Sequence, residues 1–213
     1  EDIACVIEKA TRASVHTVQQ DMTRGFISCG FGLRLGICGT GIISGCVVSG
    51  LRDISSVSIR IPHEVRSCGG NAAKMLYGSR DNTLVVSPPG GGKTTLLREL
   101  IRSISASGIR IAVADERREL AAMYRGSPQF DIGPATDVML DIPKAESVMM
   151  LLRTMNPQVI VMDEISTPDD CSAAASAIGC GVRVIASAHA ASVDELKKRA
   201  VYRGLIESGA FTA

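Results

Sequence analysis

The chain has 213 residues, of which 46% are hydrophobic, so it can hold one large domain or a small domain followed by a medium one. Its formal net charge of +1 excludes the strong positive field with which many nucleic-acid-binding and membrane-surface proteins attract their partners. No apolar run is long enough to cross a bilayer, and no signal peptide is recognisable. The seven cysteines are scattered without a CxxC pair, so we expect reduced core thiols in a cytoplasmic protein.

Residues 1–65 predict a small α+β domain. Apolar residues recur at helical spacing over residues 3–22, which predicts two short amphipathic helices. Glycines separate short apolar runs over residues 25–50, and apolar and polar residues alternate over residues 57–61. This pattern predicts a small antiparallel sheet. We interpret residues 66–82 as a linker that leads into the second domain.

Residues 83–213 predict a second domain in which strands and helices alternate. The predicted strands are 84–86, 109–114, 159–162 and 182–186, and the predicted helices are 93–107, 144–155, 169–179 and segments within 193–208. Near-continuous apolar strands with helical crossovers predict an α/β architecture, a mainly parallel sheet covered by helices on both faces. A polar stretch rich in glycine and proline, residues 123–141, predicts a working loop rather than core.

The most specific motif is LVVSPPGGGKTTLL, in which an apolar strand, a glycine-rich turn and a helix start follow one another. This is the order of a phosphate-binding loop, where glycines let backbone N–H groups approach phosphate oxygens that a Cβ would block. Together with the alternating strands and helices, it predicts an α/β domain of the RecA-like P-loop class. We expect Lys93 to reach the phosphates of ATP and to be unburied while the loop is empty, and Thr94 to bind Mg²⁺. The alternative is a glycine-rich turn that happens to precede a lysine. The expected ATP-binding residues are Ser87, Pro88, Pro89, Gly90, Gly91, Gly92, Lys93, Thr94 and Thr95.

Two further predicted strands end in polar residues that could complete such a site. Asp163 and Glu164 follow an apolar strand; we expect Asp163 to hold Mg²⁺ and Glu164 to orient and deprotonate the attacking water. An acid pair that only caps the next helix is the alternative. We expect the strand 182–186 to lie beside the phosphate-loop strand, so that Ser187 or His189 senses the γ-phosphate or positions water. A structural role is the alternative for this histidine.

Several longer segments together resemble one known family. SPPGGGKTTLLREL, VADERRELAAMYRG, KAESVMMLLRTMNPQVIVMDEI and VIASAHA are similar to the stage III sporulation protein AA family, relatives of the type II/IV secretion ATPases in endospore-forming bacteria. The resemblance runs through essentially the whole chain. It implies a cytoplasmic, hexameric ATPase that energises a channel between mother cell and forespore. Membrane proteins of that channel would be its partners and its only contact with the membrane, and no nucleic acid is implied.

The resemblance also implies roles for single residues. Asp115 and Glu116 match the acidic box of secretion ATPases, His189 matches their histidine box, and Arg153 matches an arginine in the helix before Asp163. Glu116, Arg153 and His189 thus join Lys93 and Glu164 as expected catalytic residues. The sequence departs from secretion ATPases in having Asp163 where they usually have glycine, and Ser87 where their loop begins with glycine.

An arginine that stabilises charge on the γ-phosphate is also expected, and four residues are candidates for it. These arginine-finger candidates are Arg60, Arg117, Arg118 and Arg125. Two other functions remain open at this point. The chain could be a nucleotide-gated scaffold with little turnover, or a nucleic-acid translocase of the same broad fold, although the near-zero charge and scarcity of aromatic residues argue against the latter.

Overall fold

The computed structural model describes residues 2–11, 22–23, 25–29, 32–65 and 70–211. Contacts within the chain divide it into two compact units. The first contains Glu1–His63 and Ala122–Gln129, and the second contains Glu64–Ala121 and Phe130–Ala213. The segment 122–129 thus belongs to the first unit although in sequence it lies within the second. The division into residues 1–65 and 83–213 expected from the sequence does not contain this segment exchange.

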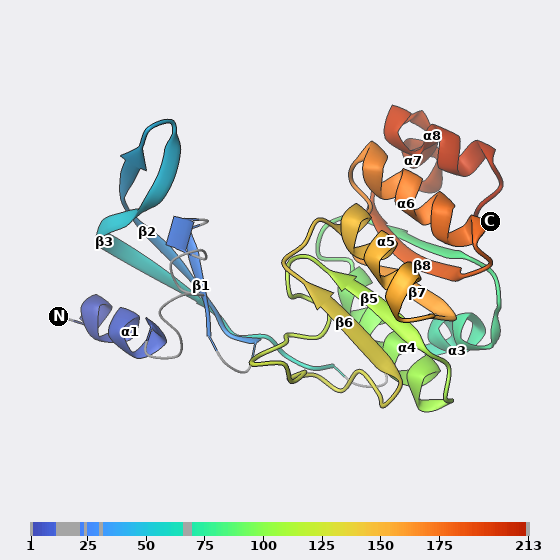
Figure 1. Cartoon of the computed structure of the whole chain (residues 1–213), viewed down its shortest axis with the longest axis horizontal. Helices are drawn as coiled ribbons and strands as arrows, with labels where there is room; N and C mark the ends of the chain where they lie inside the picture. Colours follow the sequence, from blue (N-terminus) through green and yellow to red (C-terminus); the bar gives the residue numbers. More distant parts are fainter. Residues whose placement is uncertain (1, 12–21, 24, 30–31, 66–69, 212–213) are drawn as a thin grey trace. The chain divides into compact units, whose positions relative to one another are not determined.

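The first unit is built on a three-stranded antiparallel sheet, which confirms the predicted hairpins (Figure 1). Its elements are α1 (Asp2–Thr11), β1 (Phe26–Ser28), β2 (Arg34–Ser44) and β3 (Val47–Arg60), with strand order β1-β2-β3. Buried Ile27, Leu35 and Ile37 form its core, against which α1 packs Val6 and Ile7. Most of the second predicted helix falls outside the described residues.

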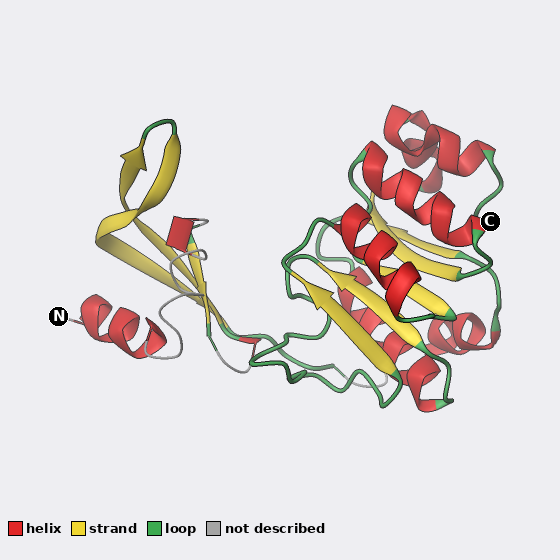
Figure 2. Ribbon diagram, viewed as in Figure 1, coloured by secondary structure: helices red, strands yellow, loops and turns green. Residues whose placement is uncertain are grey.

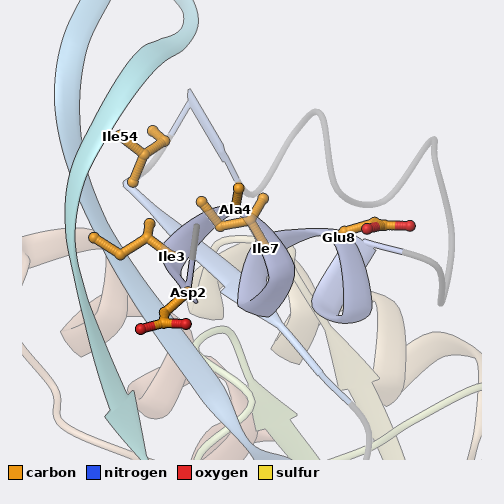
Figure 3. Close-up of a pocket in the computed structure, with 6 residues that line it drawn as sticks. All are labelled: Asp2, Ile3, Ala4, Ile7, Glu8 and Ile54. Carbon is orange, nitrogen blue, oxygen red and sulfur yellow. The ribbon is translucent and has the colours of Figure 1, made fainter.

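Away from this core, the first unit exposes apolar side chains. The turn between β2 and β3 is made at Gly45, whose φ is +65°, and beside it Ile43 and Val47 are 70% and 69% exposed. An open groove lies between α1 and β3, lined mainly by Ile3, Ile7 and Ile54 (Figure 3). Neither feature contains a predicted site residue.

The second unit is a five-stranded sheet in which every pair of neighbouring strands is parallel. Its strand order is β4-β8-β7-β5-β6, with β4 (Thr83–Ser87), β5 (Ile111–Asp115), β6 (Thr136–Leu140), β7 (Val159–Met162) and β8 (Arg183–His189). Helices cover both faces, as predicted (Figures 1 and 2). They are α3 (Gly70–Gly78), α4 (Lys93–Ala106), α5 (Lys144–Thr154), α6 (Pro168–Gly179), α7 (Val193–Lys198) and α8 (Ala200–Glu207).

Both faces of the central strands are buried because their side chains alternate between two layers of helices. Ile160 and Met162 of β7 belong to the core shared with α5, α6 and α8, whereas Val161, also fully buried, points to the other face. On that face α4 buries Leu97 and Ile101 completely. None of the helices in the described ranges is long and apolar enough to traverse a membrane.

The prediction of a working loop over residues 123–141 is wrong in part. Residues 136–140 form β6, which pairs with β5 at the edge of the sheet, and Phe130 and Ile132 are buried. An edge strand has one neighbour and one solvated side, so β6 needs no continuous apolar run. Its five residues, two polar followed by three apolar, show no alternation and are too few to distinguish from a loop by pattern alone.

The expectation of core thiols is also wrong for most of the cysteines. Cys171 is buried in α6, where burial raises the pKa of its thiol to about 11. Cys29 is half-buried, and Cys68 lies outside the described residues. The exposed cysteines are Cys5, Cys38, Cys46 and Cys180.

Candidate active site

The phosphate loop, the acid pair and His189 meet at the carboxyl edge of the parallel sheet. β8 pairs with β4 on one side and β7 on the other, which confirms the predicted position of this strand beside the loop strand. The register places His189 directly opposite Ser87, the first residue of the loop. On the other side of β8, Met162 pairs with Ala186, so Asp163 and Glu164 emerge next to His189.

The conformation of the loop accounts for its three glycines. Gly90 and Gly92 have φ values of +77° and +80°, which favour glycine. A Cβ on Gly91 would lie 2.2 Å from Ser87 Oγ and 3.1 Å from the Pro88 carbonyl oxygen, so a side chain at this position would displace Ser87. Gly92 is the N-cap of α4 and offers no side-chain acceptor to the first turn. The backbone N–H groups there are thus available to an anion.

Lys93 is buried, at 6% exposure, and the expectation that it is unburied in the empty loop is wrong. Its Nζ donates to the backbone carbonyl oxygens of Ser87 and Pro88 at 2.8 and 3.0 Å. It also lies 2.8 Å from Nδ1 of His189. An ammonium group has three donors, and here three acceptors take the place of water, which makes its burial possible.

Asp163 joins the loop helix to the neighbouring strand. The Thr94 hydroxyl donates to Asp163 Oδ2 at 3.3 Å, and the Ser187 hydroxyl donates to Oδ1 at 2.8 Å. The same Ser187 oxygen accepts the backbone N–H of Glu164 at 2.9 Å, so one fully buried hydroxyl fixes both acids. The sequence indicates Ser187 only as an alternative to His189. The sequence signal that could have shown its bonding role is a serine within an otherwise apolar buried strand.

Replacing Ser187 by alanine is expected to lower the free energy of unfolding by about 1–3 kcal/mol, because Asp163 loses a buried donor and the Glu164 N–H loses its acceptor. Urea denaturation would measure the change. Ser172→Ala is a matched control, since that hydroxyl donates to the Pro168 carbonyl on the exposed surface of α6; its effect should stay below about 0.5 kcal/mol. Equal losses in the two variants would contradict the assignment.

Glu164 is held between a histidine and an arginine. Its Oε2 lies 3.5 Å from His189 Nε2 and 3.3 Å from Arg117 Nη1. Because Lys93 donates to Nδ1 of His189, the hydrogen of the neutral ring belongs on Nε2, facing Glu164. Glu164 also has a φ of +48°, which is uncommon for a residue with a side chain. A lysine, a histidine and a carboxylate therefore form a continuous row of polar contacts.

The acidic-box residues lie at the same edge but have partners of their own. Asp115 is 1% exposed, and its carboxylate accepts the backbone N–H groups of residues 119–121. Burial raises the pKa of Asp115. Glu116 accepts from Lys144 Nζ at 3.0 Å, at the start of α5. Both acids, with Lys144, Asp163 and Glu164, line a small cavity of about 20 Å³.

Arg153 lies elsewhere. It is an exposed residue in the last turn of α5, which ends shortly before β7 begins. The nearby Asn156 carbonyl accepts from Arg110, the residue before β5. Arg153 is therefore at the amino edge of the sheet, and the structure does not bring it together with Lys93 or Glu164 of its own chain.

The finger candidates are in four different environments. Arg117 reaches Glu164, and its side chain is 61% exposed. Arg118 makes a bidentate ion pair with Asp141, in which Nε donates to Oδ1 at 2.9 Å and Nη2 donates to Oδ2 at 2.5 Å. Arg125 lies over the ring of Tyr124, and Arg60 is exposed at the end of β3. Of the four, Arg117 is the one placed at the acid pair of its own chain.

This strand order, with a glycine-rich loop at the start of α4 and an acid pair after β7, defines a P-loop fold of the RecA-like class. Solved structures agree. The Legionella pneumophila ATPase DotB matches with a TM-score of 0.52 at 18% identity, over 85% of this chain and 47% of that chain. The ATPase DotB of Yersinia pseudotuberculosis matches with a TM-score of 0.53 at 15% identity, over 82% of this chain and 47% of that chain. The pilus retraction motor PilT with bound ADP matches with a TM-score of 0.50 at 17% identity, over 74% of this chain and 44% of that chain. The chain spans about half the length of these structures.

The chain belongs to the sporulation stage III, protein AA family, whose model matches residues 1–213. It is 38% identical to stage III sporulation protein AA of Bacillus subtilis (strain 168), over 99% of this chain and 71% of that protein. An uncharacterised ycf45 protein of Cyanidium caldarium is 28% identical, over 72% of this chain and 46% of its own length. The resemblance noted from the sequence is thereby confirmed.

Proposed function

We propose that this chain is a Mg²⁺-dependent ATPase. The observation that carries the proposal is the contact between Thr94 and Asp163, with Glu164 beside them. It joins the start of the phosphate-loop helix to the strand end that bears the acids, so one site holds phosphate-binding, metal-binding and water-activating groups. Lys93, His189 and Glu164 extend this arrangement from the loop to the acid pair.

The residues present fit ATP and Mg²⁺. The open space at Gly90 and Gly92, where an added Cβ would meet nothing within 4 Å, and the uncapped start of α4 suit a phosphate group. Thr94 and Asp163 would hold Mg²⁺, which supplies positive charge to the phosphate oxygens when bound. Within the described ranges no three His, Cys, Asp or Glu side chains converge into a metal cluster. That suits Mg²⁺, because it is usually held by one or two protein groups together with phosphate and water.

In hydrolysis, Lys93, Glu164 and His189 each have a distinct task. With ATP bound, Lys93 would donate to phosphate oxygens in place of the carbonyl oxygens of Ser87 and Pro88. Glu164 accepts the proton of the attacking water. The Ser187 hydroxyl, which accepts the Glu164 backbone N–H and donates to Asp163, keeps the backbone of Glu164 next to Asp163. His189 faces both the loop and Glu164 and is placed to detect the terminal phosphate.

We further propose that hydrolysis drives a sporulation channel. The family membership and the secretion ATPase fold support a hexameric ring at the cytoplasmic face of an envelope complex between mother cell and forespore, with membrane proteins as partners. The test is the native mass of the purified chain with and without MgATP, together with ATP-dependent association with membranes from sporulating cells. A chain that stays monomeric under all conditions would contradict the ring.

Lys93→Ala is expected to abolish measurable ATP binding and hydrolysis, because the variant lacks the cation that neutralises the phosphates. Binding would be measured by calorimetry with MgATP. Because Lys93 also bonds two loop carbonyls, the fold must be checked by the melting temperature. Lys198→Ala, an exposed lysine of α7, is the matched control and should bind normally. Wild-type affinity in a folded Lys93→Ala protein would refute the site.

Turnover separates this proposal from a nucleotide-gated scaffold. If the chain binds MgATP and forms rings but its single-turnover hydrolysis is no faster than that of the Lys93→Ala variant, the scaffold is correct. A nucleic-acid translocase would instead show ATPase activity that rises on addition of DNA.

A further inference from the structure

We propose that Arg199 and Tyr202 are positioning residues that hold His189 and Glu164 in their working geometry. Both lie in the helical segment α7–α8, which the sequence patterns did not connect with the site. The proposal rests on the ATPase function proposed above. It assigns to the C-terminal helices a role in hydrolysis in addition to covering the sheet.

Arg199 supports the end of β8. It lies between α7 and α8, and its Nη1 donates to the backbone carbonyl of His189 at 2.7 Å. Its Nη2 donates to Glu195 at 2.6 Å, and Glu195 also accepts the backbone N–H of Ala191 at 2.7 Å. The Arg199–Glu195 ion pair therefore hydrogen-bonds the backbone on both sides of Ala190. A shift of this pair would move the His189 ring relative to Lys93.

Tyr202 supports the segment that carries Glu164. Its ring is 4% exposed within the core formed with α6, and its hydroxyl donates to the Ile165 carbonyl at 2.5 Å. The N–H of Ile165 donates to the Ser187 carbonyl at 2.8 Å. The residue after Glu164 is thus held by the sheet on one side and by α8 on the other.

These two contacts act on a part of the site where small movements matter. Glu164 has a left-handed backbone, and its carboxylate faces His189 at 3.5 Å, so its direction depends on how the next residue is fixed. Misplacement of a reacting group by about 1 Å can cost on the order of 10²-fold in rate. The phosphate loop touches neither Arg199 nor Tyr202 through these bonds. Nucleotide affinity should therefore be insensitive to them.

The first test is kinetic and uses Tyr202→Phe, which removes only the hydroxyl and keeps the ring in the core. We expect kcat to fall by about 10-fold while the dissociation constant for MgATP stays within about twofold. Arg199→Ala should act in the same direction, and Arg199→Lys, which keeps a cationic donor group without the guanidinium fork, should recover part of the rate. Arg203→Ala changes an exposed arginine of α8 and is the matched control with normal kcat.

The second test needs no activity. The chain has three histidines, so the ring ¹⁵N signals of His189 can be assigned by their loss in His189→Asn. We expect Tyr202→Phe and Arg199→Ala, but not Arg203→Ala, to shift these signals in the protein without nucleotide. Unchanged His189 signals in both variants would overturn the positioning role, as would a loss of MgATP affinity as large as the loss of kcat. If the wild type hydrolyses no ATP, the proposed function fails, and the ¹⁵N shifts alone decide the positioning role.

Discussion

Replacing Glu164 by glutamine is expected to slow ATP hydrolysis by roughly 10²–10⁴-fold while leaving MgATP binding intact, because glutamine keeps the size of the side chain but cannot accept the proton of the water. Hydrolysis under single-turnover conditions, with excess protein, measures the chemical step without product release. Binding of MgATP is measured on the same variant. Asp163→Asn should differ from it by weakening the dependence on Mg²⁺.

Glu116→Gln is the informative comparison for Glu164→Gln. Both acids line the same small cavity, but Glu116 is paired with Lys144 and bonds the start of α5, whereas Glu164 faces His189 and Arg117. A normal rate in Glu164→Gln together with a severe loss in Glu116→Gln would move the water-activating role to Glu116. Equal, severe losses in both would show that the cavity acts as one unit.

The second large effect concerns self-association: hydrolysis per chain should rise with protein concentration and level off once rings form. Charge that develops on the γ-phosphate calls for an arginine, and one supplied by a neighbouring chain contributes on the order of 10³–10⁵ in rate. Arg118 is already paired with Asp141, which makes it the weakest candidate. Arg60 and Arg125, both in the first unit, are the candidates to act on a neighbour's nucleotide.

Mixing variants tests the shared site directly. A Glu164→Gln chain and an Arg60→Ala or Arg125→Ala chain each lack what the other supplies, so mixed rings should recover part of the activity. Arg117 is the informative comparison, because it already reaches Glu164 of its own chain. If Arg117→Ala is inactive and cannot be rescued by Glu164→Gln, while activity per chain stays constant down to monomeric dilution, the arginine acts within one chain and the shared-site model is wrong.

The sequence by itself determined the class of fold and indicated the residues of the candidate site. The glycines before Lys93 and the acids after the apolar run 159–162 are local signals, because each depends on backbone conformation and residue type over a few positions. The alternation of apolar strands and helices was equally readable, since a parallel sheet buried on both faces requires continuous apolar strands. Hence the sheet, the loop and the strand neighbouring it were predicted correctly.

The tertiary structure decided which groups meet and which are already occupied. Lys93 is buried because β8 places His189 opposite Ser87, a contact between residues 96 positions apart in sequence. The roles of Ser187 and Tyr202 depend on hydrogen bonds to Asp163 and Ile165, which lie 24 and 37 positions away in the sequence. Edge strand β6 was missed for a related reason: strand pairing with β5, and not its own composition, makes it a strand. Local sequence specifies backbone geometry, whereas long-range pairing sets the distances on which the chemistry depends.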